Sequence, residues 1–196
     1  GHFALILAFL VAVAQGLLPL IGAHDGKFGG KPQWVALARP AAQVQFLLIA
    51  FSFACLAQSF LSNDFSVAYV ANHSNTRLPT LYRFSAVWGG HEGSLLLWVL
   101  MLAGWGAAVS LTARQLPETM VARVLAVLGL VAIGLLAFIL FTSNPFERML
   151  PAAAEGRDLN PLLQDPGLVF HPPMLYMGYV GFSVAFAFAI AALISG

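Results

Sequence analysis

A histidine followed by two prolines, His171-Pro172-Pro173, is the strongest candidate for chemistry in this sequence. Proline is favoured in the first turn of a helix, where its missing N–H leaves no bond unmade. We therefore expect His171 at the start of a helix, with its imidazole held by a rigid backbone. An imidazole held in this way at a membrane surface suits an axial ligand of haem iron. The alternative is a capping or hydrogen-bonded surface histidine, which is the commoner role of an isolated histidine.

A second histidine, His91, is followed by Glu92 at the edge of an apolar segment. Three glycines around this pair disfavour helix, whereas Ser94 is a good N-cap. We predict a helix that starts at Ser94, with His91 and Glu92 in a tight loop just outside it. Residue Leu95 stands where a zinc-protease helix needs its second histidine, which excludes that chemistry. A structural His–Glu pair, which we favour, and a cofactor contact remain.

Three further side chains are candidates for supporting such a site. Arg157 can pair with Asp158 or Asp165, which is the default, or meet the propionates of a haem through its planar fork. Tyr176 either flanks the histidine before the two prolines or belongs to the interfacial aromatic belt. Trp88 is expected to mark the headgroup level of the membrane.

Composition places these residues in a membrane protein. The 196-residue chain is 60% hydrophobic and 9% charged, and its mean hydropathy is +0.84, whereas soluble domains carry about 25% charged residues. The apolar surplus must therefore face membrane lipids. A net charge of +1 gives no case for a nucleic acid partner, and the single Cys55 excludes a disulfide framework. The chain begins with Gly1, and we expect it to be cut or processed at both ends.

Five uncharged apolar runs each approach the ~20 residues that cross a bilayer as a helix. We therefore predict an all-α fold, a polytopic integral membrane helical bundle, with residues 1–196 forming a single membrane domain. The first run exceeds a signal-peptide core and has no basic residue before it, which favours a span over a secretory signal. The five predicted spans are 3–21, 41–61, 94–111, 124–141 and 174–194.

Five spans leave four loops that alternate between the two sides of the membrane. Loops 22–40 and 112–123 carry five of the nine basic residues, although loops 62–93 and 142–173 are longer. The positive-inside rule therefore places the short loops in the cytoplasm and the two longer loops outside, which is the periplasm in a Gram-negative cell. The external face then holds four of the five histidines, namely His2, His73, His91 and His171.

Three stretches of the chain are long and irregular: WGGHEGSLLLWVLML (88–102), FTSNPFERMLP (141–151) and GRDLNPLLQDPGLVFHPPMLYMGYVGFSVAFA (156–187). They resemble the CcmF and NrfE family of cytochrome c maturation proteins, which belongs to the haem-handling superfamily. ALARPAAQVQF (36–46) and NDFSVAYVA (63–71) also resemble the N-terminal region of that family. The resemblance thus covers essentially the whole chain.

The resemblance implies a polytopic haem lyase component of the bacterial inner membrane. In that family the protein receives haem from the chaperone CcmE and, with CcmH, promotes attachment of the haem vinyl groups to the CxxCH thiols of apocytochrome c at the periplasmic face. Haem lies under a tryptophan-rich motif between two periplasmic histidines, and His171 matches the first of these. The resemblance makes other residues candidates for supporting the haem or a partner surface, namely Trp88, His91, Glu92, Arg157 and Tyr176. It implies no catalytic residue in this chain, because the thiols come from the substrate.

The second histidine, the tryptophan-rich motif and the ligands of a separate haem b come later in the family's chain. This sequence therefore resembles an N-terminal portion, which we expect to be inactive as a lyase by itself. Another class of function is a proton- or quinone-handling respiratory subunit with His91 and Glu92 as a relay. Such subunits carry ionisable residues within their spans, and the predicted spans contain none. A non-catalytic assembly scaffold is a further alternative and is compatible with a haem site.

Overall fold

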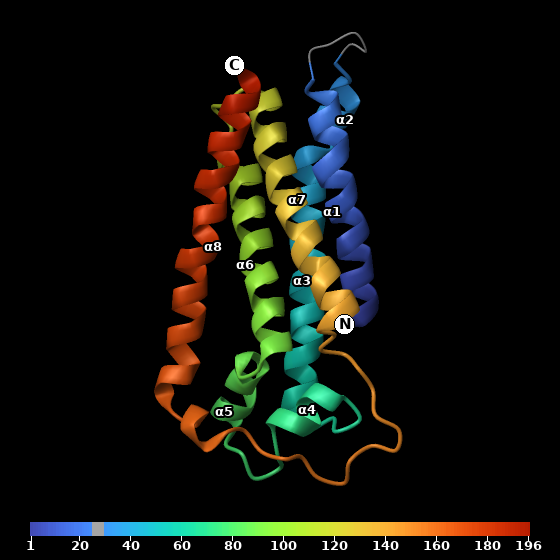
Figure 1. Ribbon diagram of the computed structural model, residues 1–196, viewed down its shortest axis with the longest axis vertical. Coiled ribbons are helices and arrows are strands. Elements are labelled where there is room, and N and C mark those ends of the chain that lie inside the picture. The colour runs from blue at the N-terminus through green and yellow to red at the C-terminus, as the bar shows by residue number, and fades with distance from the viewer. Residues whose placement is uncertain (25–29) are drawn as a thin grey trace.

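The computed structural model describes residues 1–24 and 30–196, and it shows long helices standing side by side (Figure 1). Five helical stretches are long and apolar enough to cross a membrane, so the five predicted spans are confirmed. The protein is therefore an all-α polytopic membrane protein. The stretches are α1 (His2–Gly22), α2 with α3 (Pro32–Ala36 and Ala38–Leu61), α6 (His91–Thr112), α7 (Glu118–Thr142) and α8 (Pro166–Ser195).

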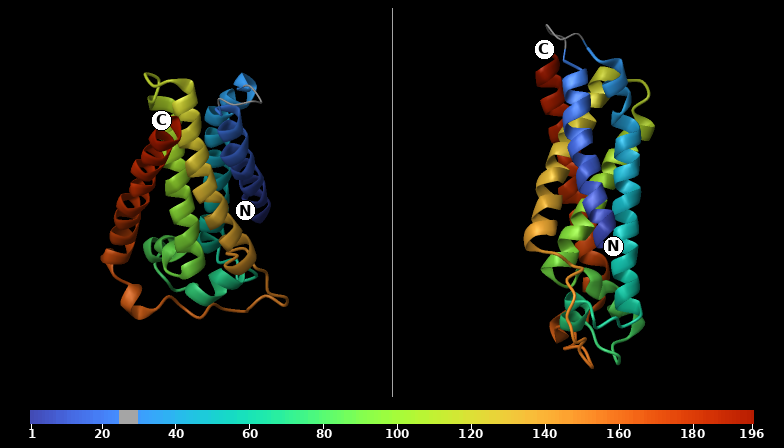
Figure 2. Two further views of the ribbon diagram at one scale, coloured as in Figure 1. Left: turned by 45° about the horizontal axis from the view of Figure 1, so that its top comes forward. Right: turned by 90° about the vertical axis from the view of Figure 1, so that its right-hand side faces the viewer.

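The remaining short elements lie at one end of the bundle, together with the two long loops (Figures 1 and 2). We call this the loop end and define it as residues 62–90 and 143–165 together with the first two turns of α1, α6 and α8. The N-terminus also lies there, whereas the C-terminus lies at the opposite end. This arrangement follows the predicted alternation of loops; Lys27, one of the basic residues used to orient the chain, lies outside the described residues. The short elements are α4 (Ala68–His73), α5 (Thr80–Ser85), η1 (Ala86–Trp88) and η2 (Pro161–Leu163).

Helix α7 packs against α1, α6 and α8, and α3 packs against α1 and α6. The contact of α1 with α7 is close because small residues face each other there. A Cβ on Gly129 would lie 2.9 Å from the backbone nitrogen of Gly16. Beside this point Gln15 donates to the carbonyl of Leu125 at 2.8 Å. Small residues and interhelical hydrogen bonds are the usual means by which membrane helices associate.

Four of the predicted helix starts were too late by three residues or more, because residues near the membrane surface extend each helix beyond the apolar run. Helix α3 begins at Ala38 rather than at 41. Helix α7 begins at Glu118 rather than at 124, directly after Pro117. Helix α6 begins at His91 rather than at Ser94. Helix α8 begins at Pro166 rather than at 174, because the side chain of Asp165 accepts the amide of Gly167 and caps the helix.

Candidate functional site

The two long loops at the loop end are joined to each other through the backbone. Val67 and Arg148 form an isolated antiparallel bridge. Further along, the amide of Arg157 donates to the carbonyl of Ala71 at 2.7 Å. Because each loop bonds to the other at more than one point, the loops form one layer over this end of the bundle.

An ion pair reinforces the same contact between the loops. Nη1 of Arg148 lies 3.0 Å from Oδ2 of Asp64, and the hydroxyl of Ser66 donates to Oδ1 of Asp64 at 2.5 Å. The hydrogen bond from Ser66 and, after it, the charge of Arg148 hold the pKa of Asp64 below its ordinary value. Both ionic partners are partly exposed, so their attraction contributes little beyond the backbone bonds.

His91 and Glu92 lie in the first turn of α6, not in the loop before it as predicted. Gly90 is the extended residue before the helix, with φ −132° and ψ 175°. Nδ1 of His91 lies 3.2 Å from the hydroxyl oxygen of Ser143, the residue that directly follows α7. His91 and Glu92 are both described, and no hydrogen bond or ion pair joins them there. The favoured interpretation of this motif, a His–Glu pair, is therefore wrong.

Tyr69 of α4 organises the turn that contains the glycines. Its hydroxyl donates to the carbonyl of Val87 and accepts the amide of Gly90, both at 3.0 Å. A Cβ on Gly93 would lie 1.7 Å from the carbonyl oxygen of Val87, so the helix can start this close only with glycine there. Burial raises the pKa of Tyr69, which keeps the hydroxyl protonated as a donor. Sequence reasoning missed this residue, because nothing in α4 indicates a contact with the glycines.

Trp88 connects this turn to α8. Its Nε1–H donates to the carbonyl of Leu168 at 2.8 Å, and its ring packs edge-on against Phe84 with 5.3 Å between centroids. Its carbonyl accepts the hydroxyl of Ser94 at 2.9 Å. Trp88 is only 7% exposed, so its ring is packed inside the protein, and its level relative to the lipid headgroups stays a prediction.

His171 lies in the second turn of α8 with its side chain exposed. The sequence predicted His171 at the helix start, but α8 begins at Pro166 and continues through Pro172 and Pro173. Among the described residues His171 has no hydrogen-bond partner, whereas the other three histidines of the loop end all have one. Those three contacts are His2 to Asn144 at 3.2 Å, His73 to the carbonyl of Tyr69 at 3.0 Å, and His91 to Ser143 at 3.2 Å.

The other candidate residues, Arg157 and Tyr176, precede and follow His171 in the chain, and Tyr176 belongs to α8 itself. Tyr176 is half-buried and packs edge-on against Trp98, with 5.5 Å between centroids. Arg157 is exposed, and in the part of the chain that the structure describes its guanidinium pairs with neither Asp158 nor Asp165. Both carboxylates instead accept backbone amides in their own turns, at 2.8 Å and 2.6 Å respectively. The default interpretation of Arg157, a surface ion pair, is therefore wrong, and its charge remains available to an anion.

The donor set at the loop end fits haem better than a bare metal ion. Within residues 1–24 and 30–196, no group of three or more His, Cys, Asp or Glu side chains is placed to hold a metal. A porphyrin supplies the equatorial ligands of its iron, so the protein needs to supply only an axial ligand. The exposed imidazole of His171 can be such a ligand.

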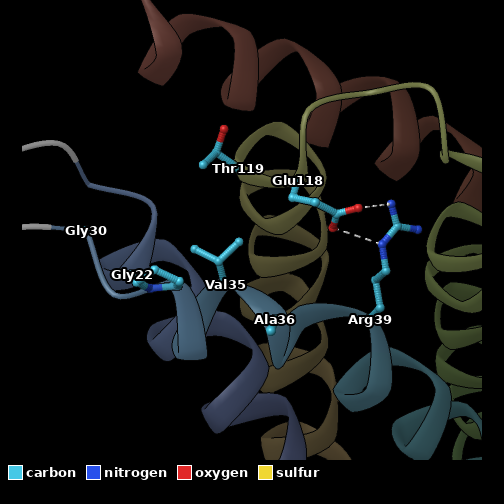
Figure 3. Close-up of a pocket in the computed structure, with 8 residues that line it drawn as sticks. Gly22, Gly30, Val35, Ala36, Arg39, Glu118 and Thr119 are labelled. Atoms are coloured by element: carbon cyan, nitrogen blue, oxygen red, sulfur yellow. Dashed lines mark hydrogen bonds and ion pairs between the residues drawn. The ribbon is translucent and has the colours of Figure 1, made fainter.

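A cavity of about 600 Å³ lies at the opposite end of the bundle (Figure 3). Arg39 and Glu118 form a two-pronged ion pair at its edge, with both N–O distances at 3.1 Å. Arg39 also donates to the carbonyl of Ala113 at 3.0 Å, so its guanidinium is already paired within the protein. The cavity is otherwise mostly apolar and lies at the opposite end of the bundle from His171, and we do not assign the chemistry to it. Its lining residues are Gly22, Gly30, Pro32, Val35, Ala36, Arg39, Glu118 and Thr119.

Comparison with known proteins identifies the family. The family model described as cytochrome C assembly protein matches residues 88–195. The whole chain is 64% identical to the cytochrome c-type biogenesis protein CcmF of Pseudomonas aeruginosa and 55% identical to CcmF of Escherichia coli, and it covers 29% and 30% of those proteins. It is 48% identical to NrfE of Haemophilus influenzae, with 99% of the chain and 30% of that protein covered.

A solved structure of the cytochrome c haem lyase CcmF has the same fold. It superimposes with a TM-score of 0.83 at 28% sequence identity, over 100% of this chain and 30% of the other. The chain thus spans about 30% of the length of the relatives it matches. It belongs to the cytochrome c assembly protein family, in the group formed by the CcmF and NrfE proteins.

Proposed function

We propose that this protein handles haem during cytochrome c maturation and that His171 is an axial ligand of the haem. One observation carries this proposal: His171 is exposed at the loop end and has no hydrogen-bond partner among the described residues. An imidazole nitrogen must be free of other bonds to bind iron. The names of the relatives and of the solved structure support the assignment to cytochrome c biogenesis and haem lyase activity.

The loop end faces the periplasm in this proposal, and the bundle lies in the inner membrane. The short connections at the opposite end carry basic residues at a higher density than the long loops do, which is typical of the cytoplasmic side. Substituted-cysteine labelling tests this orientation in a Cys55→Ser background. An impermeant maleimide should react in intact cells with cysteine at exposed Thr76 but not at exposed Arg114. The reverse pattern would contradict the orientation.

The reaction that follows from this arrangement uses the protein mainly to hold and orient haem. The chaperone CcmE delivers haem, and CcmH works with this protein to present apocytochrome c. His171 binds the iron while a vinyl edge stays accessible at the surface. Each substrate thiol then adds across a vinyl C=C bond, so that a C–S bond forms, the thiol proton ends on the neighbouring carbon, and no net oxidation occurs. The proposal requires no nucleophile or general base from this chain.

The test is the absorption spectrum of the full-length protein purified with and without His171→Ala. We expect the substitution to remove most of the Soret absorbance that depends on this site and to reduce covalent cytochrome c in the same cells. His24→Ala is the matched control, because His24 is an exposed histidine at the opposite end. Unchanged haem retention and unchanged cytochrome c maturation in His171→Ala would refute the assignment.

The same cells also distinguish the proton- or quinone-handling alternative. Glu92 is half-buried at the start of α6. Under that alternative, Glu92→Gln should impair proton coupling while haem content stays normal. Under the haem proposal, Glu92→Gln leaves proton coupling unaffected.

A further inference from the structure

Two prolines interrupt the hydrogen bonding of α8 directly after His171. In an α-helix each carbonyl accepts the amide four residues further on. Pro172 and Pro173 have no N–H, so the carbonyls of Leu168 and Val169 lose their partners within the helix. Both carbonyls belong to the four residues 168–171, the helical turn that ends at His171. This turn is therefore joined to the rest of α8 by fewer backbone bonds than an ordinary helical turn.

Trp88 replaces one of the missing donors. Its Nε1–H bonds at 2.8 Å to the carbonyl of Leu168, the acceptor that Pro172 leaves without an amide. Both residues are buried, so water does not compete for this carbonyl. The indole is itself held in place by the ring of Phe84 and by the bond from Ser94 to the Trp88 carbonyl. A side chain from another loop thus substitutes for a backbone amide of α8.

We infer that Trp88 is a positioning residue, whose indole N–H fixes the turn of α8 that carries His171 and so sets the direction of the imidazole. This inference rests on the proposed role of His171 as a haem ligand. It also gives a role to the WGGHEGS stretch (88–94), because Tyr69 and the glycines fold a turn that places Trp88 against α8. The ring of Trp88 fills space as any large aromatic would, whereas the N–H has no equivalent in phenylalanine.

Hydrogen–deuterium exchange of the full-length protein without haem tests the positioning role directly. Trp88→Phe keeps a ring and removes the N–H, and we expect the amides of residues 168–171 to exchange about tenfold faster. Pro172→Ala returns an amide to the position that bonds Leu168, so the double variant Trp88→Phe/Pro172→Ala should exchange at nearly the original rate. Trp105→Phe is the matched control, because the Trp105 indole has no hydrogen bond among the described residues. Amides of α1 and α7 report in each sample that the bundle is folded.

The inference is overturned if the amides of residues 168–171 exchange no faster in Trp88→Phe than in Trp105→Phe. It is also overturned if adding Pro172→Ala to Trp88→Phe fails to slow that exchange. If the Trp88 ring acts only through packing, Pro172→Ala should not reverse the faster exchange, because an added amide cannot replace lost packing.

The haem spectrum separates this inference from the proposed function. In the haem-loaded protein we expect Trp88→Phe to shift the Soret maximum or the low-spin electron paramagnetic resonance signal, while His171→Ala removes the signal of this site. If His171→Ala has no effect and the exchange data hold, the haem assignment fails and the hydrogen-bond role of Trp88 stands. If His171→Ala removes the signal and Trp88→Phe changes neither exchange nor spectrum, the ligand stands and the inference on Trp88 fails.

Discussion

Replacing Tyr69 by phenylalanine should open the loop end without disturbing the membrane helices. The substitution removes one hydroxyl, which donates to Val87 and accepts from Gly90, both at 3.0 Å. Tyr69 is 3% exposed, so water cannot easily take over either bond. Two buried hydrogen bonds at about 1 kcal/mol each amount to about 2 kcal/mol, which is roughly a 30-fold larger opening constant for this turn.

Hydrogen exchange measures that opening constant at the amides of residues 87–93. Tyr82→Phe is the control, because Tyr82 is a half-buried tyrosine of the same loop whose hydroxyl has no partner among the described residues. We expect accelerated exchange in Tyr69→Phe, little change in Tyr82→Phe, and unchanged exchange in α7 for both. Equal exchange in the two variants would refute the argument that the Tyr69 hydroxyl holds the start of α6.

Two further predictions concern the helix packing and the contact between the loops. Gly129→Ala should destabilise the bundle by about 1–3 kcal/mol, because the new Cβ would meet the backbone of α1 at 2.9 Å. Gly134→Ala, in open space on the same helix, should be neutral. Equal midpoints of detergent unfolding for Gly129→Ala and Gly134→Ala would contradict the close contact of α1 with α7. The folded-state pKa of Asp64 lies below the ordinary value of 3.8. The ionised carboxylate therefore stabilises the loop contact fully above pH 3.8, and this stabilisation is lost as the pH falls through the folded-state pKa. The Met149 amide, which bonds to Ser66, should therefore open more readily in acid, and Asp64→Asn should remove this pH dependence; persistence of the dependence in that variant would assign it to another group.

The existence of the five membrane helices could be predicted because hydrocarbon imposes a simple requirement, an uncharged run of sufficient length. The helix ends could not be predicted in the same way, because contacts with distant residues determine them. Three glycines argue against a helix before Ser94, yet α6 begins at His91 because the Tyr69 hydroxyl holds the preceding turn. Two prolines argue for a helix start at His171, yet α8 begins five residues earlier, at Pro166.

The candidate site was predictable only in part, for a related reason. The types and order of residues indicated His171, because a histidine before two prolines is distinctive in a linear sequence. They could not show that Trp88 is buried, because its partner is a backbone carbonyl, and any residue type at 168 would present one. The loop pairing that brings Arg157 to Ala71 is also between backbone groups, and it has no sequence signature.

Both long loops contact the first turn of α8. Asp165, from the second loop, caps the beginning of this turn at 2.6 Å, and Trp88, from the first, bonds to its Leu168 carbonyl at 2.8 Å. The two prolines weaken the connection between the turn and the membrane-spanning part of α8, so these loop contacts carry more of its positioning than they would in an uninterrupted helix. It follows that substitutions at positions 88 and 172 should be strongly non-additive, because they act on one acceptor, whereas substitutions at 88 and 129 should add independently.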